Sequence, residues 1–155
     1  MLNKWIEVNY KFRGVHCWKT CSIDIVDFLK NVHHHEFELT VKYEVTDSDR
    51  QIEFITEQLV LEKLIHHIFK NYNDDKKAVD EIFDNLYKEH QLEPCDFTPY
   101  TADFRGYSCE MICEELLNWL KRIHPYINIS LKISEDGHYA GGVDYVETMI
   151  AKSII

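Results

Sequence analysis

Residues 32–45, VHHHEFELTVKYEV, alternate between apolar and charged side chains. Successive side chains of a β-strand point to opposite faces, so this alternation predicts a strand with one buried and one solvated face, as in antiparallel sheets. His34 falls on the polar face. His33 and His35 fall on the apolar face, which continues with the side chains of Phe37, Leu39, Val41, Tyr43 and Val45.

Two further segments show the same period, and a turn predicts a fourth strand. Residues 4–16 place an apolar series on one face that ends in a histidine: Ile6, Val8, Tyr10, Phe12 and His16. Residues 127–135 alternate likewise and bring Glu135 onto the apolar face. After the turn-rich EDGHYAGG, a fourth strand is expected to begin near Val143.

In the middle of the chain, apolar residues recur at the spacing of an α-helix. Thr56 is expected to cap a helix with the inward stripe Leu61, Leu64, Ile65 and Ile68, and Ser108 a helix with Ile112, Cys113, Leu116, Trp119, Leu120 and Ile123 inward. Between them, the stripe Val79, Ile82, Phe83 and Leu86 places His90 on the same face. The order strand, strand, helices, strand, strand predicts an α+β fold, an antiparallel four-stranded sheet with helices on one face, as a single domain over residues 1–155.

The composition restricts the classes of binding partner and the cellular compartment that we expect. The net charge of −10 argues against nucleic-acid binding and against an anionic membrane surface. No apolar run is long enough to cross a membrane, and the N-terminus lacks the pattern of a signal peptide. Five cysteines without a secretion signal indicate a reducing cytoplasm instead of a disulfide framework.

If the first two strands form a hairpin, His16, His33 and His35 meet at their adjoining ends on the apolar face. Three histidines with an open fourth position are typical of a catalytic zinc site, and burial favours the neutral imidazole that binds metal. The alternative is that each histidine is a core-edge residue with a satisfied hydrogen bond. Three together favour zinc as the cofactor, with His34 solvated.

The sequence resembles the 6-pyruvoyl-tetrahydropterin synthase and 6-carboxytetrahydropterin synthase family. The resemblance lies in short segments spread over the chain in the family's order: FRGVH (12–16), HHHEF (33–37), IEF (52–54), YSCE (107–110) and LKISE (131–135). It implies a tunnelling fold with ββααββ order, whose sheets join into a barrel in a homo-oligomer, most often a hexamer. It also implies zinc on the three histidines, a pterin or purine-like ring held at a subunit interface, and a place in tetrahydropterin or queuosine biosynthesis.

The resemblance assigns substrate binding to Glu110 and Glu135. A pterin presents a row of N–H donors that a carboxylate accepts in paired, charge-assisted bonds. Glu110 lies in the first turn of its helix, where an anion is favoured, although many first-turn glutamates are merely structural. Glu135 lies on an apolar face, where a carboxylate needs a partner.

The expected proton-transfer groups depart from the family pattern. The family cysteine just before His-X-His is absent here, and the candidates are Cys17 and Cys21, of which Cys21 is preferred because the loop can curl back over the metal there. Either cysteine could equally be a small buried residue. For the family's Asp-His pair, the nearest candidates are Glu89 and His90.

Two classes of function remain open. The resemblance implies a zinc-dependent lyase that acts on 7,8-dihydroneopterin triphosphate, with Cys21, Glu89 and His90 as catalytic residues. The alternative is a family member without the chemistry, which binds or sequesters a pterin, a purine-like base or a nucleotide.

Overall fold

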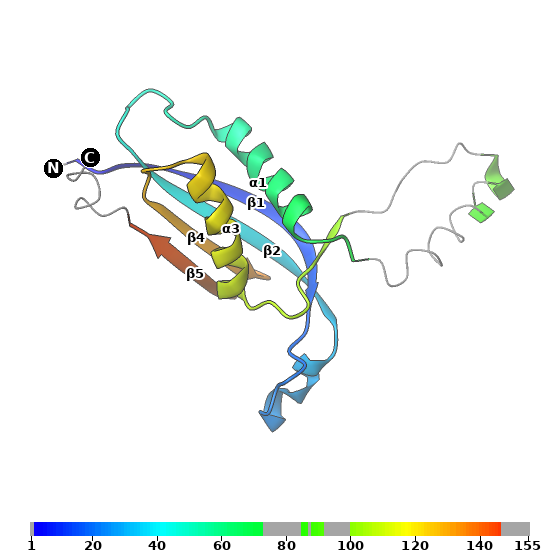
Figure 1. The fold of residues 1–155 in the computed structure, drawn as a ribbon. Helices are drawn as coiled ribbons and strands as arrows, with labels where there is room; N and C mark the ends of the chain where they lie inside the picture. The colour runs from blue at the N-terminus through cyan, green and yellow to red at the C-terminus, as the bar shows by residue number, and fades with distance from the viewer. Residues whose placement is uncertain (1, 73–84, 87, 92–99, 147–155) are drawn as a thin grey trace.

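The computed structural model describes residues 2–72, 85–86, 88–91 and 100–146. Its centre is a five-stranded sheet in the order β3-β1-β2-β4-β5 (Figure 1). β1 pairs with β2, β2 with β4, and β4 with β5, all antiparallel, whereas β1 and β3 are parallel. The strands are β1 (Lys4–His16), β2 (His33–Val45), β3 (Thr101–Asp103), β4 (Ile129–Glu135) and β5 (Tyr139–Tyr145).

The predicted fold class, an antiparallel four-stranded sheet in ββααββ order, is therefore wrong. The sheet is mixed, and the strand β3 lies between the two long helices in the chain. β3 has three residues and forms by pairing with Arg13–Val15, which are far away in sequence. So short a strand shows no periodicity, which is why the sequence gives no sign of it.

The long hairpin β1–β2 has the register that the alternation predicts. His16 pairs with His33 at the loop end, and Val8 pairs with Val41 further along. The central part of the apolar face of β2 is fully enclosed, with Phe37, Leu39, Val41 and Tyr43 all at 0% exposure. The opposite face carries charged side chains, including an ion pair between Lys11 and Glu38.

Two helices cover the apolar face of the sheet (Figure 1). α1 (Phe54–Ile68) packs against β1 and buries Leu61, Leu64 and Ile65. Its N-cap is Glu53 instead of the predicted Thr56, because the Glu53 carboxylate accepts hydrogen bonds from the backbone N–H groups of Ile55 and Thr56. Thr56 is thus already inside the first turn.

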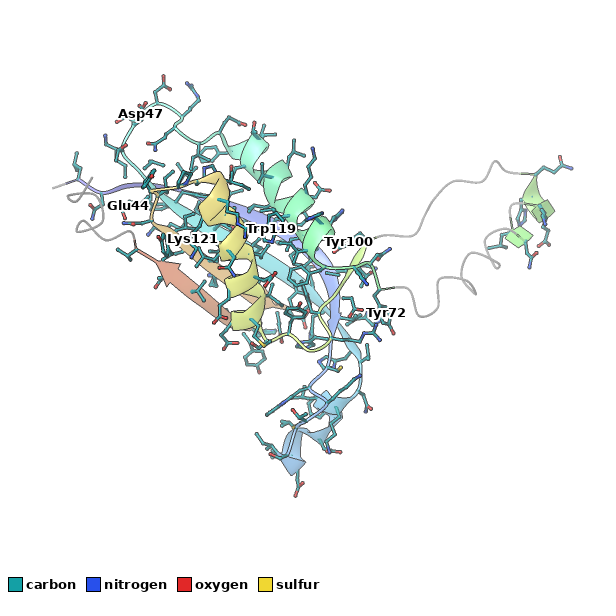
Figure 2. The ribbon with its side chains drawn as sticks, in the orientation of Figure 1. Glu44, Asp47, Tyr72, Tyr100, Trp119 and Lys121 are labelled. Atoms are coloured by element: carbon teal, nitrogen blue, oxygen red, sulfur yellow. The ribbon has the colours of Figure 1, made fainter. Side chains whose placement is uncertain are left out.

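The helix α3 (Cys109–Ile123) packs against β4 and β5. The predicted cap is confirmed, since the Ser108 hydroxyl accepts from the N–H of Met111 at 3.2 Å. Of the predicted inward stripe, Ile123 is exposed, because it lies at the end of the helix. Lys121, labelled in Figure 2, places its Nζ 4.7 Å from the centre of the Tyr145 ring and so ties the helix to β5.

The ends of two elements differ from the sequence prediction. β4 begins at Ile129 instead of 127, and β5 begins at Tyr139 instead of near Val143. β5 starts earlier because Asp136 and Gly137, at φ 52° and 73°, reverse the chain at once after β4. This left-handed pair brings the turn next to the start of β2, where the Asp136 N–H donates to the Glu36 carbonyl.

Between β1 and β2 the chain forms the 3₁₀ segment η1 (Asp24–Lys30), in which no residue is buried. It lies at the tip of the hairpin, which extends beyond the part of the sheet that the helices cover (Figure 1). The predicted helical stripe Val79, Ile82 and Phe83 lies outside the described residues, while Leu86 is exposed. No helix in the described ranges has the length and apolarity that a membrane span requires.

Candidate metal centre and adjoining cavity

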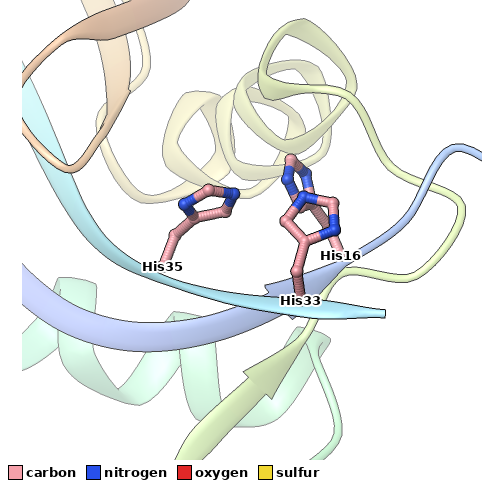
Figure 3. A group of neighbouring side chains, drawn as sticks. All are labelled: His16, His33 and His35. Carbon is pink, nitrogen blue, oxygen red and sulfur yellow. The ribbon is translucent and has the colours of Figure 1, made fainter. Parts of the chain in front are cut away.

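The three predicted metal ligands meet. His16 ends β1, and His33 and His35 open β2, so the hairpin register brings the rings together on the side of the strands that faces α3 (Figure 3). The ring centres lie 4.4–4.8 Å apart, and one nitrogen from each ring lies within 4.8 Å of the others. His34 points to the other face, is exposed, and contacts the ring of Tyr72.

Each ring turns its Nδ1 atom toward an oxygen. The Nδ1 of His33 lies 2.7 Å from the carbonyl oxygen of Asn31, and that of His35 lies 2.5 Å from Oδ2 of Asp136. The Nδ1 of His16 lies 3.4 Å from Oε1 of Glu135. An acceptor at Nδ1 holds the proton there and leaves the lone pair of Nε2 free, which is the usual arrangement around metal-binding histidines.

The remaining nitrogens support the same assignment. The Nε2 atoms of His16 and His33 are buried and make no hydrogen bond within the described part of the chain. The Nε2 of His35 lies 3.9 Å from Glu135, beyond hydrogen-bond distance. Buried polar atoms without a partner are rare in folded proteins, so these nitrogens fit a ligand that the chain itself does not supply. Three imidazole nitrogens are a donor set that zinc accepts.

The electrostatics favour the neutral ring that a metal requires. Burial lowers the pKa of His16, and the neighbouring rings of His33 and His35 lower it further, which outweighs the opposing effect of Glu135. At Asp136, the hydrogen bond from His35 and another from the backbone N–H of Glu36 hold the pKa of the carboxyl below its usual range.

A cavity of about 780 Å³ adjoins the histidines. Its wall combines the loop after β1, the segment that leads into α3, the end of β4 and the start of β5. His16, His33 and Glu135 form its boundary with the histidine cluster. The remaining wall contains aromatic, cationic, acidic and thiol side chains: Trp18, Tyr107, Tyr139, Lys19, Arg105, Glu110, Cys17 and Cys109. This volume suits a small-molecule ligand.

Both predicted substrate-binding glutamates line this cavity. Glu110 is exposed in the first turn of α3. Glu135 is largely enclosed and accepts a hydrogen bond from the thiol of Cys109 at 3.4 Å, besides its contact with His16. The carboxylates thus flank the cavity, one on the helix and one on the sheet.

The start of α3 approaches β5 closely at Gly141, which has no side chain. A Cβ atom added to Gly141 would lie 3.0 Å from Cβ of Cys109 and 3.1 Å from Cδ of Glu110. The start of α3 can therefore approach β5 closely enough to place Glu110 and Cys109 at the cavity.

The predicted catalytic residues are not brought to the cavity. Cys21 is buried in the loop after β1, where its Sγ lies 3.7 and 3.8 Å from the carbonyl oxygens of Ile23 and Val26. Glu89 and His90 are exposed on a short helical stretch and are not among the residues that line the cavity. Of the two loop cysteines, Cys17 is the one that lines the cavity.

Two residues of the site, Cys109 and Asp136, were not predicted from the sequence. Cys109 stands inside the YSCE segment but carries no signal of its own, since its role depends on Glu135 of a distant strand. Burial, followed by the negative charge and hydrogen bond of Glu135, raises the pKa of the Cys109 thiol to about 12. Asp136 stands in a turn, and the only available sign is an Asp-Gly pair after an apolar strand.

No family model matches the chain, and no curated protein matches it. Among solved structures it is similar to the uncharacterized protein WS1659 from Wolinella succinogenes, with a TM-score of 0.61 and 13% sequence identity. The match covers 94% of this chain and 100% of the other. At this identity the likeness shows a shared fold alone, so the resemblance to the pterin synthases stays a prediction.

Proposed function

We propose that the chain is a zinc-dependent enzyme that processes a pterin, most specifically a lyase acting on 7,8-dihydroneopterin triphosphate. The observation that carries the proposal is the convergence of His16, His33 and His35, each with an oxygen at Nδ1, at the end of a cavity large enough for a small molecule. The identity of the substrate rests on the family resemblance.

In this proposal the three histidines hold zinc through Nε2. Zinc held there would supply Lewis-acid polarisation of a substrate oxygen. Glu135 and Glu110 accept hydrogen bonds from the N–H groups of the heterocycle and so orient it. Lys19, in the cavity wall, supplies positive charge for an anionic substituent.

A second candidate function is binding without catalysis. It is favoured by a specific observation: none of the predicted proton-transfer groups, Cys21, Glu89 and His90, lines the cavity. A protein that sequesters a pterin, a purine-like base or a nucleotide needs the cavity and its carboxylates but no group that moves protons. For catalysis, Cys21, Glu89 and His90 remain predictions.

The test is to incubate the zinc-loaded protein with 7,8-dihydroneopterin triphosphate and to follow the products by liquid chromatography and mass spectrometry. The lyase proposal predicts turnover that falls at least ~100-fold in Cys21→Ser if this thiol acts in proton transfer. Binding of a pterin measured by calorimetry, weakened in Glu110→Gln and unaccompanied by turnover, would favour the binder. Absence of both turnover and binding would reject both functions.

We also propose that the protein is a cytoplasmic homo-oligomer. The described cysteines are free, which agrees with a reducing compartment. In the sheet, residues 70–72 cover the outer edge of β3 through backbone hydrogen bonds to Thr101 and Asp103. β5 pairs with β4 on one side, and among the described residues no strand pairs with its other edge. Such an edge favours association with another chain.

A further inference from the structure

Asp136 is tied to Glu36 of β2 by two hydrogen bonds, one to its side chain and one from its backbone. Its Oδ1 accepts from the backbone N–H of Glu36 at 2.8 Å, and its own N–H donates to the Glu36 carbonyl at 2.8 Å. With these two bonds fixing the residue, Oδ2 lies 2.5 Å from Nδ1 of His35. The contact with the histidine is therefore built into the join between β2 and the β4–β5 turn.

The backbone of Asp136 is in the left-handed region, at φ 52°. Among residues other than glycine, Asp and Asn tolerate this conformation best. Gly137 follows at φ 73°, so the turn reverses directly after Glu135. This tight reversal is what carries the Asp136 carboxylate back to the opening of β2.

The three histidines do not have equivalent partners. The Nδ1 of His33 faces a neutral carbonyl oxygen. The Nδ1 atoms of His16 and His35 both face carboxylates, but the Glu135 oxygen lies 3.4 Å from His16, whereas the Asp136 oxygen lies only 2.5 Å from His35. A carboxylate at Nδ1 fixes the ring orientation, holds the proton on Nδ1 and makes the opposite nitrogen a stronger donor to a metal.

We propose that Asp136 is a positioning residue of the metal centre. It holds His35 as the Nδ1–H tautomer with Nε2 directed at the metal position, and the affinity for metal depends on it. The inference rests on the proposed function, because it concerns the same three histidines.

The test compares Asp136→Asn with Glu36→Gln in the full chain. Asn tolerates the left-handed backbone, and its amide oxygen can keep the bond from the N–H of Glu36. The amide NH₂ group then faces Nδ1 of His35 and moves the ring proton to Nε2. The control removes a carboxylate from a neighbouring exposed position on the opposite face of β2.

Two readouts are measured: zinc affinity by competition with a chromogenic chelator, and the His35 tautomer in the metal-free protein by nitrogen-15 NMR. Asp136→Asn is expected to weaken zinc binding ~10–100-fold and to shift His35 from Nδ1–H to Nε2–H, while Glu36→Gln changes neither. If Asp136→Asn does not fold, Asp136→Gly retains the backbone conformation, lacks the carboxylate and carries the same expectation for affinity.

The outcomes separate the two claims. Zinc binding by the wild type with equal affinity and the same His35 tautomer in Asp136→Asn would overturn the role of Asp136 and leave the metal centre standing. A wild type that binds no zinc would overturn the metal centre, and the positioning role with it.

Discussion

At the scale of single residues, Glu135 connects the two halves of the site. Its carboxylate lies 3.4 Å from Nδ1 of His16 and accepts a hydrogen bond from the Cys109 thiol. One side chain therefore contacts a predicted metal ligand and the wall of the cavity. Its placement on the apolar face of its strand was predictable from alternation, but its partner Cys109 was not.

The contact with Glu135 predicts an unreactive thiol at Cys109. Because burial and Glu135 raise its pKa to about 12, the thiol stays protonated below that pH, and its reactivity rises only as the pH approaches 12. At pH 8, alkylation of Cys109 by iodoacetamide, followed by peptide mass spectrometry, should be at least ~100-fold slower than that of a free cysteine. A half-maximal rate near pH 8.5 would contradict the prediction.

The residue scale also shows which parts of the site a sequence can reveal. His16, His33 and His35 were predictable because a period of two decides which side chains share a face, and a hairpin decides which strand ends meet. The Nδ1 partner Asp136 comes from a turn that joins two other strands. Its contact with His35 spans about a hundred positions of sequence, and no local pattern encodes it.

At the scale of elements, a buried polar cluster joins the two helices to the sheet. The carboxylate of Glu57 in α1, 4% exposed, accepts a hydrogen bond from the Tyr43 hydroxyl at 2.6 Å and lies 2.9 Å from Nε2 of His124. His124 is the C-cap residue of α3, and Tyr43 belongs to β2. The cluster therefore fixes how α1 and α3 sit on the sheet.

This cluster predicts a pH-dependent stability. Burial raises the pKa of Glu57, but the hydrogen bonds with His124 and Tyr43 and the attraction to His124 outweigh it, so the pKa lies below its usual range. The stabilisation is then complete above the unfolded-state pKa of about 4.3 and is lost as the pH falls through the lower folded-state value.

Glu57→Gln is accordingly expected to lower the free energy of unfolding by about 1–3 kcal/mol at pH 7, measured by urea denaturation. The difference from the wild type should shrink as the pH falls below 4. Glu114→Gln, at an exposed position of α3, serves as the control. A difference that is constant from pH 7 to pH 3 would contradict an ionised Glu57 in the folded protein.

Elements were predictable where their pattern is local. The Ser108 cap and the strands β1, β2 and β4 follow from residues within one segment, whereas β5 begins four positions before the predicted start. The cap Glu53 was missed because glutamate is not a usual capping residue, and β3 was missed because three residues acquire strand geometry only by pairing with β1.

At the scale of the whole molecule, the sheet is asymmetric. The β3 edge is covered by residues 70–72, whereas within the described ranges no strand pairs with the outer edge of β5. Apolar side chains are also exposed at the tip of the β1–β2 hairpin, with Ile25 at 86% and Phe28 at 63% exposure. An exposed edge and an exposed apolar tip both mark surfaces for association.

The prediction at this scale is a homo-oligomer in solution. Light scattering coupled to gel filtration at micromolar concentration should report a mass of at least twice the 18.5 kDa of one chain. Ile25→Asp places a charge on the exposed tip. If the tip is part of the interface, the measured mass of this variant should fall. A stable monomer of the wild-type chain at this concentration would contradict the prediction.

The central claim is that three histidines on one face of the β1–β2 hairpin hold a metal, and metal analysis of paired variants tests it most directly. The wild type, His33→Ala and His34→Ala are purified, loaded with zinc, freed of excess metal and analysed by mass spectrometry of the elements. The wild type and His34→Ala should each retain about one zinc per chain, whereas His33→Ala should retain almost none. Equal zinc content in His33→Ala and His34→Ala would contradict the account.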